Sequence, residues 1–287
     1  MFKKAKELVE NNPSVFESFK VSKLFGEEVF LVKPLKGKEL QAWHLFRSEK
    51  IIAVLCDGYQ TELEYKILYP LLSYHQNGDY DKYDSPRQLL EAANENALAL
   101  INSELKEAPI ESTWDDLFSI LNFENCIDDD YLHEIEQSFK IGKYKYVSQI
   151  EKDIYIKEEA QGCGKIYKGE LDIELFVNPT LVILPIAKYA DSLAYNTWYA
   201  GENFGHERII AKFRDYEDKF GALILANTGT VLYIYVEYPP KSIESGFYLS
   251  QELSHLASST YYSEATTLRA WARGITQSNI WRLHERP

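Results

Sequence analysis

One stretch of the chain, residues 76–140, holds almost all of its excess negative charge. It contains sixteen Asp and Glu residues against four Lys and Arg residues, whereas the remainder of the 287-residue chain has 28 acidic and 27 basic residues. Runs of like charge are usually solvated. The stretch therefore has two possible roles. Either it is a solubilising surface that binds nothing, or its electrostatic field attracts a basic partner.

Several patterns predict that this acidic stretch is helical. Ser85 and Pro86 place a capping residue before a proline at the first helical position. Thr113 and Asp116 have the spacing of a capping box. Apolar residues recur at helical spacing after the first of these caps, at Leu89, Ala93, Ala97, Leu100 and Leu105.

Aromatic residues lie among these carboxylates, and aromatic side chains beside charge are typical of interaction hot spots. We therefore expect this stretch to bind a basic protein, and we expect the same field to repel nucleic acid and anionic membranes. The candidate partner-binding residues are Asp79, Tyr80, Asp81, Tyr83, Trp114, Asp115, Asp116, Asp128, Asp129, Asp130 and Tyr131. Asp128–130 also have a structural explanation, since acidic residues favour the first turn of a helix.

The composition is that of a globular protein, with 45% hydrophobic and 26% charged residues. The longest apolar run, residues 180–187, is too short to cross a membrane and contains Pro185. The first residues alternate charged and apolar side chains, unlike a signal peptide. Three widely spaced cysteines, Cys56, Cys126 and Cys163, suit a protein with reduced thiols. We therefore expect a cytoplasmic protein.

The pattern of apolar residues predicts an α+β fold in which helices pack on a mixed, mostly antiparallel sheet, with the acidic helical segment added. Early in the chain, 29–33 and 51–56 read as strands that flank a helix at 37–47. A helix at 206–220 ends at Gly221, and a hairpin turn at 227–230 joins two strands.

The alternation in 146–156 predicts a strand, and 170–186 predicts two strands broken at Asn178-Pro179. We expect three parts: an N-terminal α/β portion (1–75), the acidic helical segment (76–140) and an α+β domain (141–287).

No recognisable catalytic or cofactor-binding motif occurs in the sequence. The six histidines lack the short spacing of a zinc site, so we expect neither metal nor cofactor. One catalytic alternative is a cysteine-dependent hydrolase or transferase in which Cys163, on a Gly-Cys-Gly turn, is the nucleophile and His206 its base, oriented by Glu207. An incidental cysteine on a turn explains the same residues.

The C-terminal part of the chain resembles a bacterial domain-of-unknown-function family, number 4253. The resemblance rests on the run LVILPIA, a loop with Trp198, a helix that ends in KFGALI, the strand exit VEYPP and a closing helix that leads to Trp281. It implies a bacterial α+β protein and names no reaction. Some members occur beside toxin and immunity genes, which suggests an immunity protein that neutralises a basic toxin. An uncharacterised housekeeping or regulatory role is the other alternative, and the oligomeric state is left open.

Overall fold

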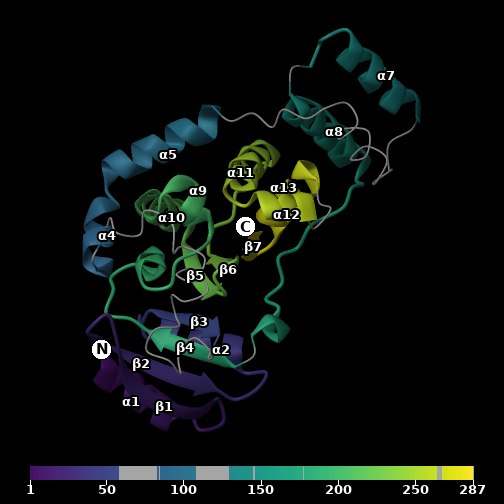
Figure 1. Cartoon of the computed structure of the whole chain (residues 1–287). Helices are drawn as coiled ribbons and strands as arrows, with labels where there is room; N and C mark the ends of the chain where they lie inside the picture. Colours follow the sequence, from purple (N-terminus) through teal and green to yellow (C-terminus); the bar gives the residue numbers. More distant parts are fainter. Residues whose placement is uncertain are drawn as a thin grey trace. The chain divides into compact units, whose positions relative to one another are not determined.

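The computed structural model describes residues 1–57, 83, 85–107, 129–144, 146–176, 178–263 and 267–286. Figure 1 shows the helices and strands along the chain. The strands are β1 (Phe16–Leu24), β2 (Glu27–Pro34), β3 (Ala53–Asp57), β4 (Pro179–Ile183), β5 (Ala222–Asn227), β6 (Val231–Val236) and β7 (Ile280–His284). The helices are α1 (Phe2–Glu10), α2 (Glu39–Ser48), α4 (Pro86–Ala92), α5 (Glu95–Glu107), α7 (Asp129–Lys140), α8 (Val147–Gln161), α9 (Ala200–Phe204), α10 (His206–Phe220), α11 (Ile243–Leu256), α12 (Ser258–Ser263) and α13 (Leu268–Gln277), with 3-10 turns η3 (Ile173–Leu175) and η4 (Tyr189–Ala194).

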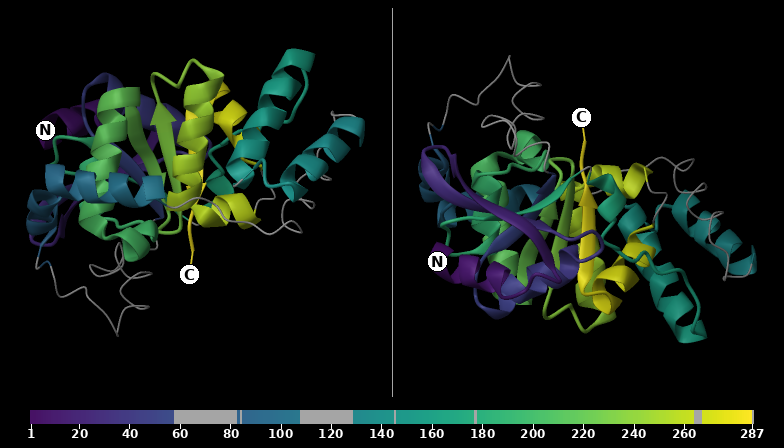
Figure 2. Two further views of the ribbon diagram at one scale, coloured as in Figure 1. Left: turned by 90° about the horizontal axis from the view of Figure 1, so that it is seen from above. Right: turned by 90° about the horizontal axis from the view of Figure 1, so that it is seen from below.

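The strands form one sheet in the order β1-β2-β4-β3-β5-β6-β7. The β1–β2, β2–β4, β3–β4 and β5–β6 pairs are antiparallel, and β3 pairs with β5 in parallel, with Cys56 opposite Asn227. The prediction of an α+β fold with a mixed, mostly antiparallel sheet is therefore confirmed. Figure 2 shows the sheet and its helices from above and below.

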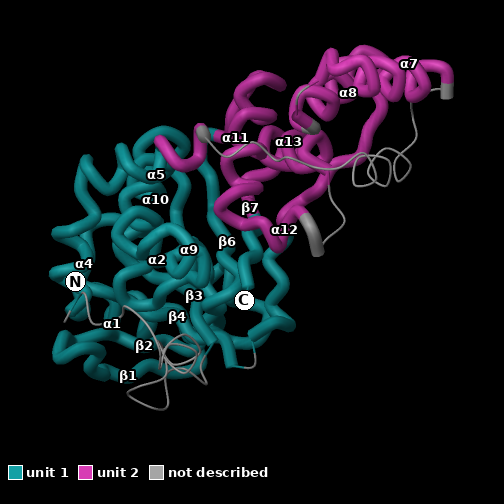
Figure 3. Tube along the Cα trace, turned by 45° about the horizontal axis from the view of Figure 1, so that its top comes forward, with its two compact units in different colours: residues 1–102, 170–238, 282–287 teal, residues 103–169, 239–281 magenta. Residues whose placement is uncertain are grey.

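The chain divides into two compact units, which Figure 3 distinguishes by colour. Unit 1 comprises Met1–Asn102, Glu170–Tyr238 and Arg282–Pro287, and unit 2 comprises Ser103–Gly169 and Pro239–Trp281. The ends of these units fall elsewhere than the domain boundaries expected after residues 75 and 140. The division into parts at residues 75 and 140 stays a prediction.

Local signals account for several elements of unit 1. The Ser85 hydroxyl accepts a hydrogen bond from the Gln88 amide at the start of α4, with Pro86 in the first helical position. Helix α10 ends at Gly221, whose φ of 59° is left-handed. The β5–β6 hairpin lies where its turn residues predict it.

The predicted strand at 146–156 is wrong, because the structure has helix α8 at Val147–Gln161. Its apolar residues also repeat every four positions, and Ile150 and Ile154 are fully buried. Of the two strands predicted in 170–186, the second is confirmed as β4. The first is wrong, because the described residues before β4 contain the 3-10 turn η3 instead. Within the described residues, no helix has the length and apolar character needed to cross a membrane.

Candidate functional site

The acidic stretch does not belong to one compact unit. Helix α4 and α5 as far as Asn102 belong to unit 1, whereas the rest of α5 and α7 belong to unit 2. The candidate partner-binding surface therefore has to be described separately for each unit.

In unit 1, buried side chains and two basic residues of α10 hold α4 and α5. Leu89, Ala97 and Ile101 are buried. The Arg214 guanidinium donates to the Leu90 carbonyl at 3.3 Å and also to the Ala93 carbonyl, and Lys212 Nζ donates to Asn102 Oδ1 at 2.7 Å. The apolar face of this part of the acidic stretch is thus fixed against unit 1.

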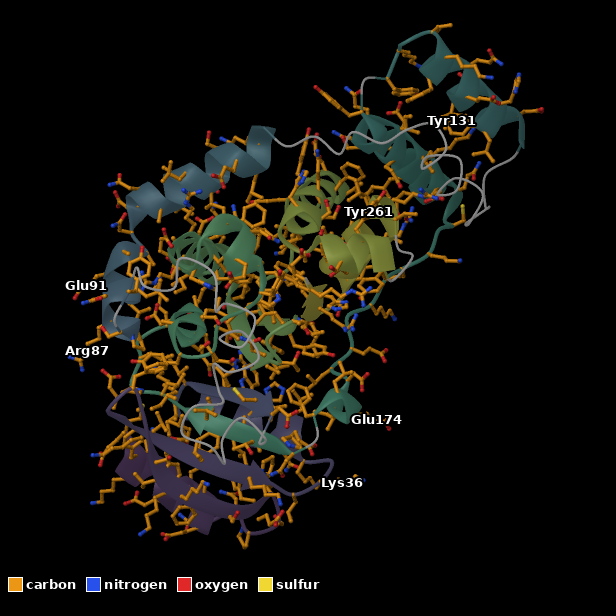
Figure 4. All side chains as sticks on the ribbon, viewed as in Figure 1. Lys36, Arg87, Glu91, Tyr131, Glu174 and Tyr261 are labelled. Atoms are coloured by element: carbon orange, nitrogen blue, oxygen red, sulfur yellow. The ribbon has the colours of Figure 1, made fainter. Side chains whose placement is uncertain are left out.

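Two carboxylates in the unit 1 part of α4 and α5 lie away from this apolar side. Glu91 and Glu95 are exposed, and neither forms an ion pair with a described residue. Figure 4 shows Glu91 and Arg87 on the outer side of α4. The negative charges of Glu91 and Glu95 are therefore not neutralised by an ion pair with any described residue.

In unit 2, the candidate residue Tyr131 lies on the inner side of α7. It is half-buried against a cluster formed by Ile135, Ile150 and Ile154, and the Lys157 ammonium lies 3.2 Å from the centre of its ring. Burial raises the pKa of Tyr131, with Asp153 and Glu134 contributing. Tyr131 therefore joins α7 to α8, and its part in partner binding stays a prediction.

The other candidates fall in three groups. Asp130 is exposed in the first turn of α7, where its charge favours the helix, and Asp129 begins that helix. Tyr83 is half-buried. The remaining candidates lie outside the described residues: Asp79, Tyr80, Asp81, Trp114, Asp115, Asp116 and Asp128.

The catalytic alternative required Cys163 and His206. Cys163 belongs to unit 2 and is disulfide-bonded, so its sulfur is not a nucleophile in this state. His206 begins α10 in unit 1, where its Nε2 lies 3.0 Å from Oε1 of Glu202 on α9. The expectation that all three cysteines are reduced is therefore wrong at Cys163. The catalytic role of Cys163 and His206 stays untested.

A polar cluster that the sequence did not reveal lies where β3 and β5 end. Asn196 Nδ2 is 3.3 Å from Cys56 Sγ, and Asn227 Nδ2 donates to the Asn196 carbonyl at 2.7 Å. Asn227 Oδ1 accepts from the Gly229 amide at 2.7 Å. Burial raises the pKa of Cys56 to about 12. Because Asn227 and Asn196 are almost completely buried, the cluster fixes the loop before α9 to the ends of the strands.

A second unpredicted cluster lies in unit 2 and joins α13 to α8 by buried ion pairs. Arg269 NH1 lies 2.6 Å from Glu151 Oε2, and Arg273 NH2 lies 2.7 Å from Glu158 Oε2. Arg273 Nε also contacts Glu159, and its guanidinium lies over the Tyr155 ring. The two arginine side chains are at most 2% exposed, so their charges need these carboxylates.

The described residues contain no group of three or more His, Cys, Asp or Glu side chains placed to hold a metal ion. Residues 180–284 match the model of a family described as Domain of unknown function (DUF4253). That range runs from β4 to β7 and includes Asn196, Asn227 and both buried arginines. No curated protein and no solved structure matches the chain.

Proposed function

We propose that this chain, whose C-terminal part carries a domain of unknown function, is a bacterial protein-binding protein that captures a basic partner through the carboxylates of residues 76–140. The specific form of the proposal is an immunity protein that acts in the cytoplasm and neutralises a cationic toxin. The observation that carries it is the outward placement of Glu91 and Glu95 on helices whose apolar sides are fixed to unit 1.

The charge distribution supports steering of a basic partner. Sixteen of the chain's 44 acidic residues lie in 76–140, so the field of the molecule is uneven and attracts cations toward one stretch. Such a field raises the association rate, whereas tight binding needs desolvated contacts near the centre of the interface. The proposal therefore requires an aromatic or apolar anchor beside the carboxylates.

A charge-reversal experiment tests the proposal. The full-length chain is immobilised and exposed to host lysate at about 50 mM and about 500 mM salt, because exposed charge contacts are screened at the higher concentration. The wild type should retain a basic protein at low salt and release it at high salt. The triple variant Glu91→Lys, Glu95→Lys, Glu134→Lys should lose at least about tenfold in affinity for that protein.

The matched control reverses three exposed carboxylates outside 76–140, in the variant Glu7→Lys, Glu170→Lys, Glu174→Lys. Both variants change the net charge equally, so only a localised surface separates them. Equal losses in both variants would indicate a general effect of net charge, and a wild type that retains no basic protein would refute the proposal.

A further inference from the structure

The loop that joins β4 to α9 is buried over most of its length. Residues 189–198 of this loop, which include the turn η4, are all buried. Loops usually run over the protein surface, because a buried loop takes polar groups away from water, and these groups then need partners within the fold. The polar side chains of residues 189–198 are therefore expected to have hydrogen-bond partners.

Most of these side chains have partners in the described part of the chain. Asp191 Oδ1 accepts a hydrogen bond from Arg214 Nε at 2.7 Å. The Ser192 hydroxyl donates to the Tyr189 carbonyl at 2.7 Å. Trp198 Nε1 donates at 3.0 Å to a carbonyl of the turn between β5 and β6. These hydrogen bonds fix the loop near both of its ends.

Two adjacent residues of the loop depart from this pattern. Asn196 Oδ1 and Thr197 Oγ1 are buried and have no hydrogen-bond partner among the described residues. Both residues are 4% exposed. A buried amide oxygen or hydroxyl without a partner lowers stability, so such atoms in native proteins are generally bonded to protein groups or to ordered water. The two oxygens therefore mark a place where a further polar group is expected.

The Asn196 carboxamide lies at the ends of two neighbouring strands. Its Nδ2 is 3.3 Å from Cys56 Sγ in β3 and 3.3 Å from the Asn227 carbonyl oxygen in β5. The carbonyl fixes the orientation of the carboxamide, because a carbonyl oxygen accepts only from its nitrogen. Oδ1 belongs to the same rigid group and therefore lies beside the same strand ends. Where neighbouring strands are parallel, as β3 and β5 are, ligands often bind at their carboxyl ends.

The surroundings of Asn196 favour a neutral ligand. Burial raises the pKa of the Cys56 thiol to about 12, so the thiol stays uncharged. The Asp57 carboxylate, which follows Cys56 in the chain, is engaged, since its Oδ1 accepts from the Asn178 amide at 3.2 Å. A charged ligand at this depth would need a counter-charge. A neutral ligand needs only hydrogen-bond partners.

The two oxygens determine what the ligand has to offer. Asn196 Oδ1 only accepts hydrogen bonds, whereas the Thr197 hydroxyl donates or accepts them. We propose that these oxygens form a buried binding site for one small neutral molecule, which donates a hydrogen bond to Asn196 Oδ1 and hydrogen-bonds to the Thr197 hydroxyl. Two sources offer this chemistry: an ordered water molecule and the carboxamide group of a small compound. The site lies within residues 180–284 and does not depend on the acidic surface proposed for a basic partner.

The first arm of the test asks whether the site is occupied in the purified full-length protein. Thr197→Val replaces the hydroxyl by a methyl group of similar size. If a bound molecule contacts this hydroxyl, the thermal unfolding midpoint should fall by about 2–4 °C. Ser192→Ala, in the same loop, is the matched control for the loss of a hydroxyl with a known partner. A rise of the midpoint in Thr197→Val would show a hydroxyl without a partner and would overturn the inference.

The second arm distinguishes the two sources, with acetamide as a neutral probe and methylammonium as a charged one. A compound that binds only the folded protein raises the unfolding midpoint as its concentration increases. If the site accepts a carboxamide, about 100 mM acetamide should raise the midpoint of the wild type and of Ser192→Ala by about 3 °C and leave that of Thr197→Val unchanged. An equal rise with methylammonium would contradict a neutral site.

A crystal structure of the full-length protein completes the test. A fall of the midpoint in Thr197→Val without any rise in acetamide assigns the site to water. One ordered water should then lie within hydrogen-bond distance of Asn196 Oδ1 and Thr197 Oγ1. If no molecule occupies that position, the inference is wrong. The capture of a basic partner has no bearing on this result, because the acidic surface and this site share no residue.

Discussion

Arg273 of α13 and Glu158 of α8 form a fully buried ion pair, with 2.7 Å between Arg273 NH2 and Glu158 Oε2. The other oxygen of Glu158 lies 3.3 Å from Arg269 Nε, so one carboxylate serves two buried guanidinium groups. Helix α13 lies inside the range that matches the domain of unknown function, and α8 lies outside it. The closing helix of that domain therefore depends on a helix from another part of the chain for its charge balance.

Removal of the Glu158 charge should lower the free energy of unfolding strongly. Glu158→Gln leaves the buried side chains of Arg269 and Arg273 with fewer carboxylates, and breaking a buried pair typically costs about 3–5 kcal/mol. Urea unfolding of the purified variant measures this loss. Glu159→Gln is the control, because Glu159 is 31% exposed and its pair should contribute less than about 1 kcal/mol. Equal losses would contradict the central role of Glu158.

Gly274 should not tolerate alanine, although alanine usually favours a helix. A Cβ at Gly274 would lie 1.7 Å from the Tyr167 carbonyl oxygen, and that segment is held by a hydrogen bond from the Tyr167 amide to the Ala270 carbonyl. Gly274→Ala should therefore destabilise the protein by about 1–3 kcal/mol, the cost of overpacking, instead of stabilising it by about 1 kcal/mol as in a free helix. Thermal unfolding decides the sign, and a stabilised variant would show that the segment around Tyr167 can move away.

Asn227 should matter more for stability than its polar side chain suggests. Asn227→Ala removes both the donor to the Asn196 carbonyl and the acceptor for the Gly229 amide, and it leaves buried groups unsatisfied at about 1–3 kcal/mol each. We expect a total loss of about 2–6 kcal/mol in denaturant unfolding. Thr228→Ala, in the same turn but only partly buried, should lose about 1 kcal/mol. A similar loss in both variants would argue against a special role for Asn227.

Cys56 and Cys163 should react slowly with alkylating agents. With its pKa at about 12, the Cys56 thiol is only about one ten-thousandth thiolate at pH 8, and it is 2% exposed. Cys163 should resist iodoacetamide until a reductant opens its disulfide. Mass spectrometry with and without reductant, and with and without denaturant, separates the two sites. Rapid labelling of Cys163 without reductant would contradict the disulfide and favour the catalytic alternative.

His255 on α11 should make stability fall as the pH drops below about 6.5. Burial lowers the pKa of His255 in the folded state, and its Nε2 is buried without a hydrogen-bond partner among the described residues. As the pH falls through 6.5, the unfolded chain therefore binds a proton that the folded protein does not, and unfolding is favoured. Replacement of His255 by Leu should flatten the stability profile between about pH 7 and pH 5. A variant with the wild-type slope would assign the effect to other groups.

The sequence by itself determined elements whose signals are local. The cap at Ser85-Pro86, the helix end at Gly221 and the β5–β6 hairpin depend on residues a few positions apart, so each could be predicted without the rest of the chain. The α+β class and the mostly antiparallel sheet followed from these elements. The apolar spacing also predicted the buried residues Leu89, Ala97 and Leu105 of α4 and α5. It was wrong at Leu100, which is 52% exposed, because the neighbouring Ile101 is the buried residue.

Only the tertiary structure decided the features that join distant residues. Residues 146–156 alternate like a strand, yet they form α8, where Glu151 and Glu158 meet arginines more than 110 positions later. The parallel pairing of Cys56 with Asn227 and the inward placement of Tyr131 likewise depend on residues outside their own strand or helix. Periodicity shows which side of a helix or strand is apolar, but it does not show which distant element covers that side. The covering element decides which charged side chains become buried and paired, so buried ion pairs cannot be predicted from periodicity.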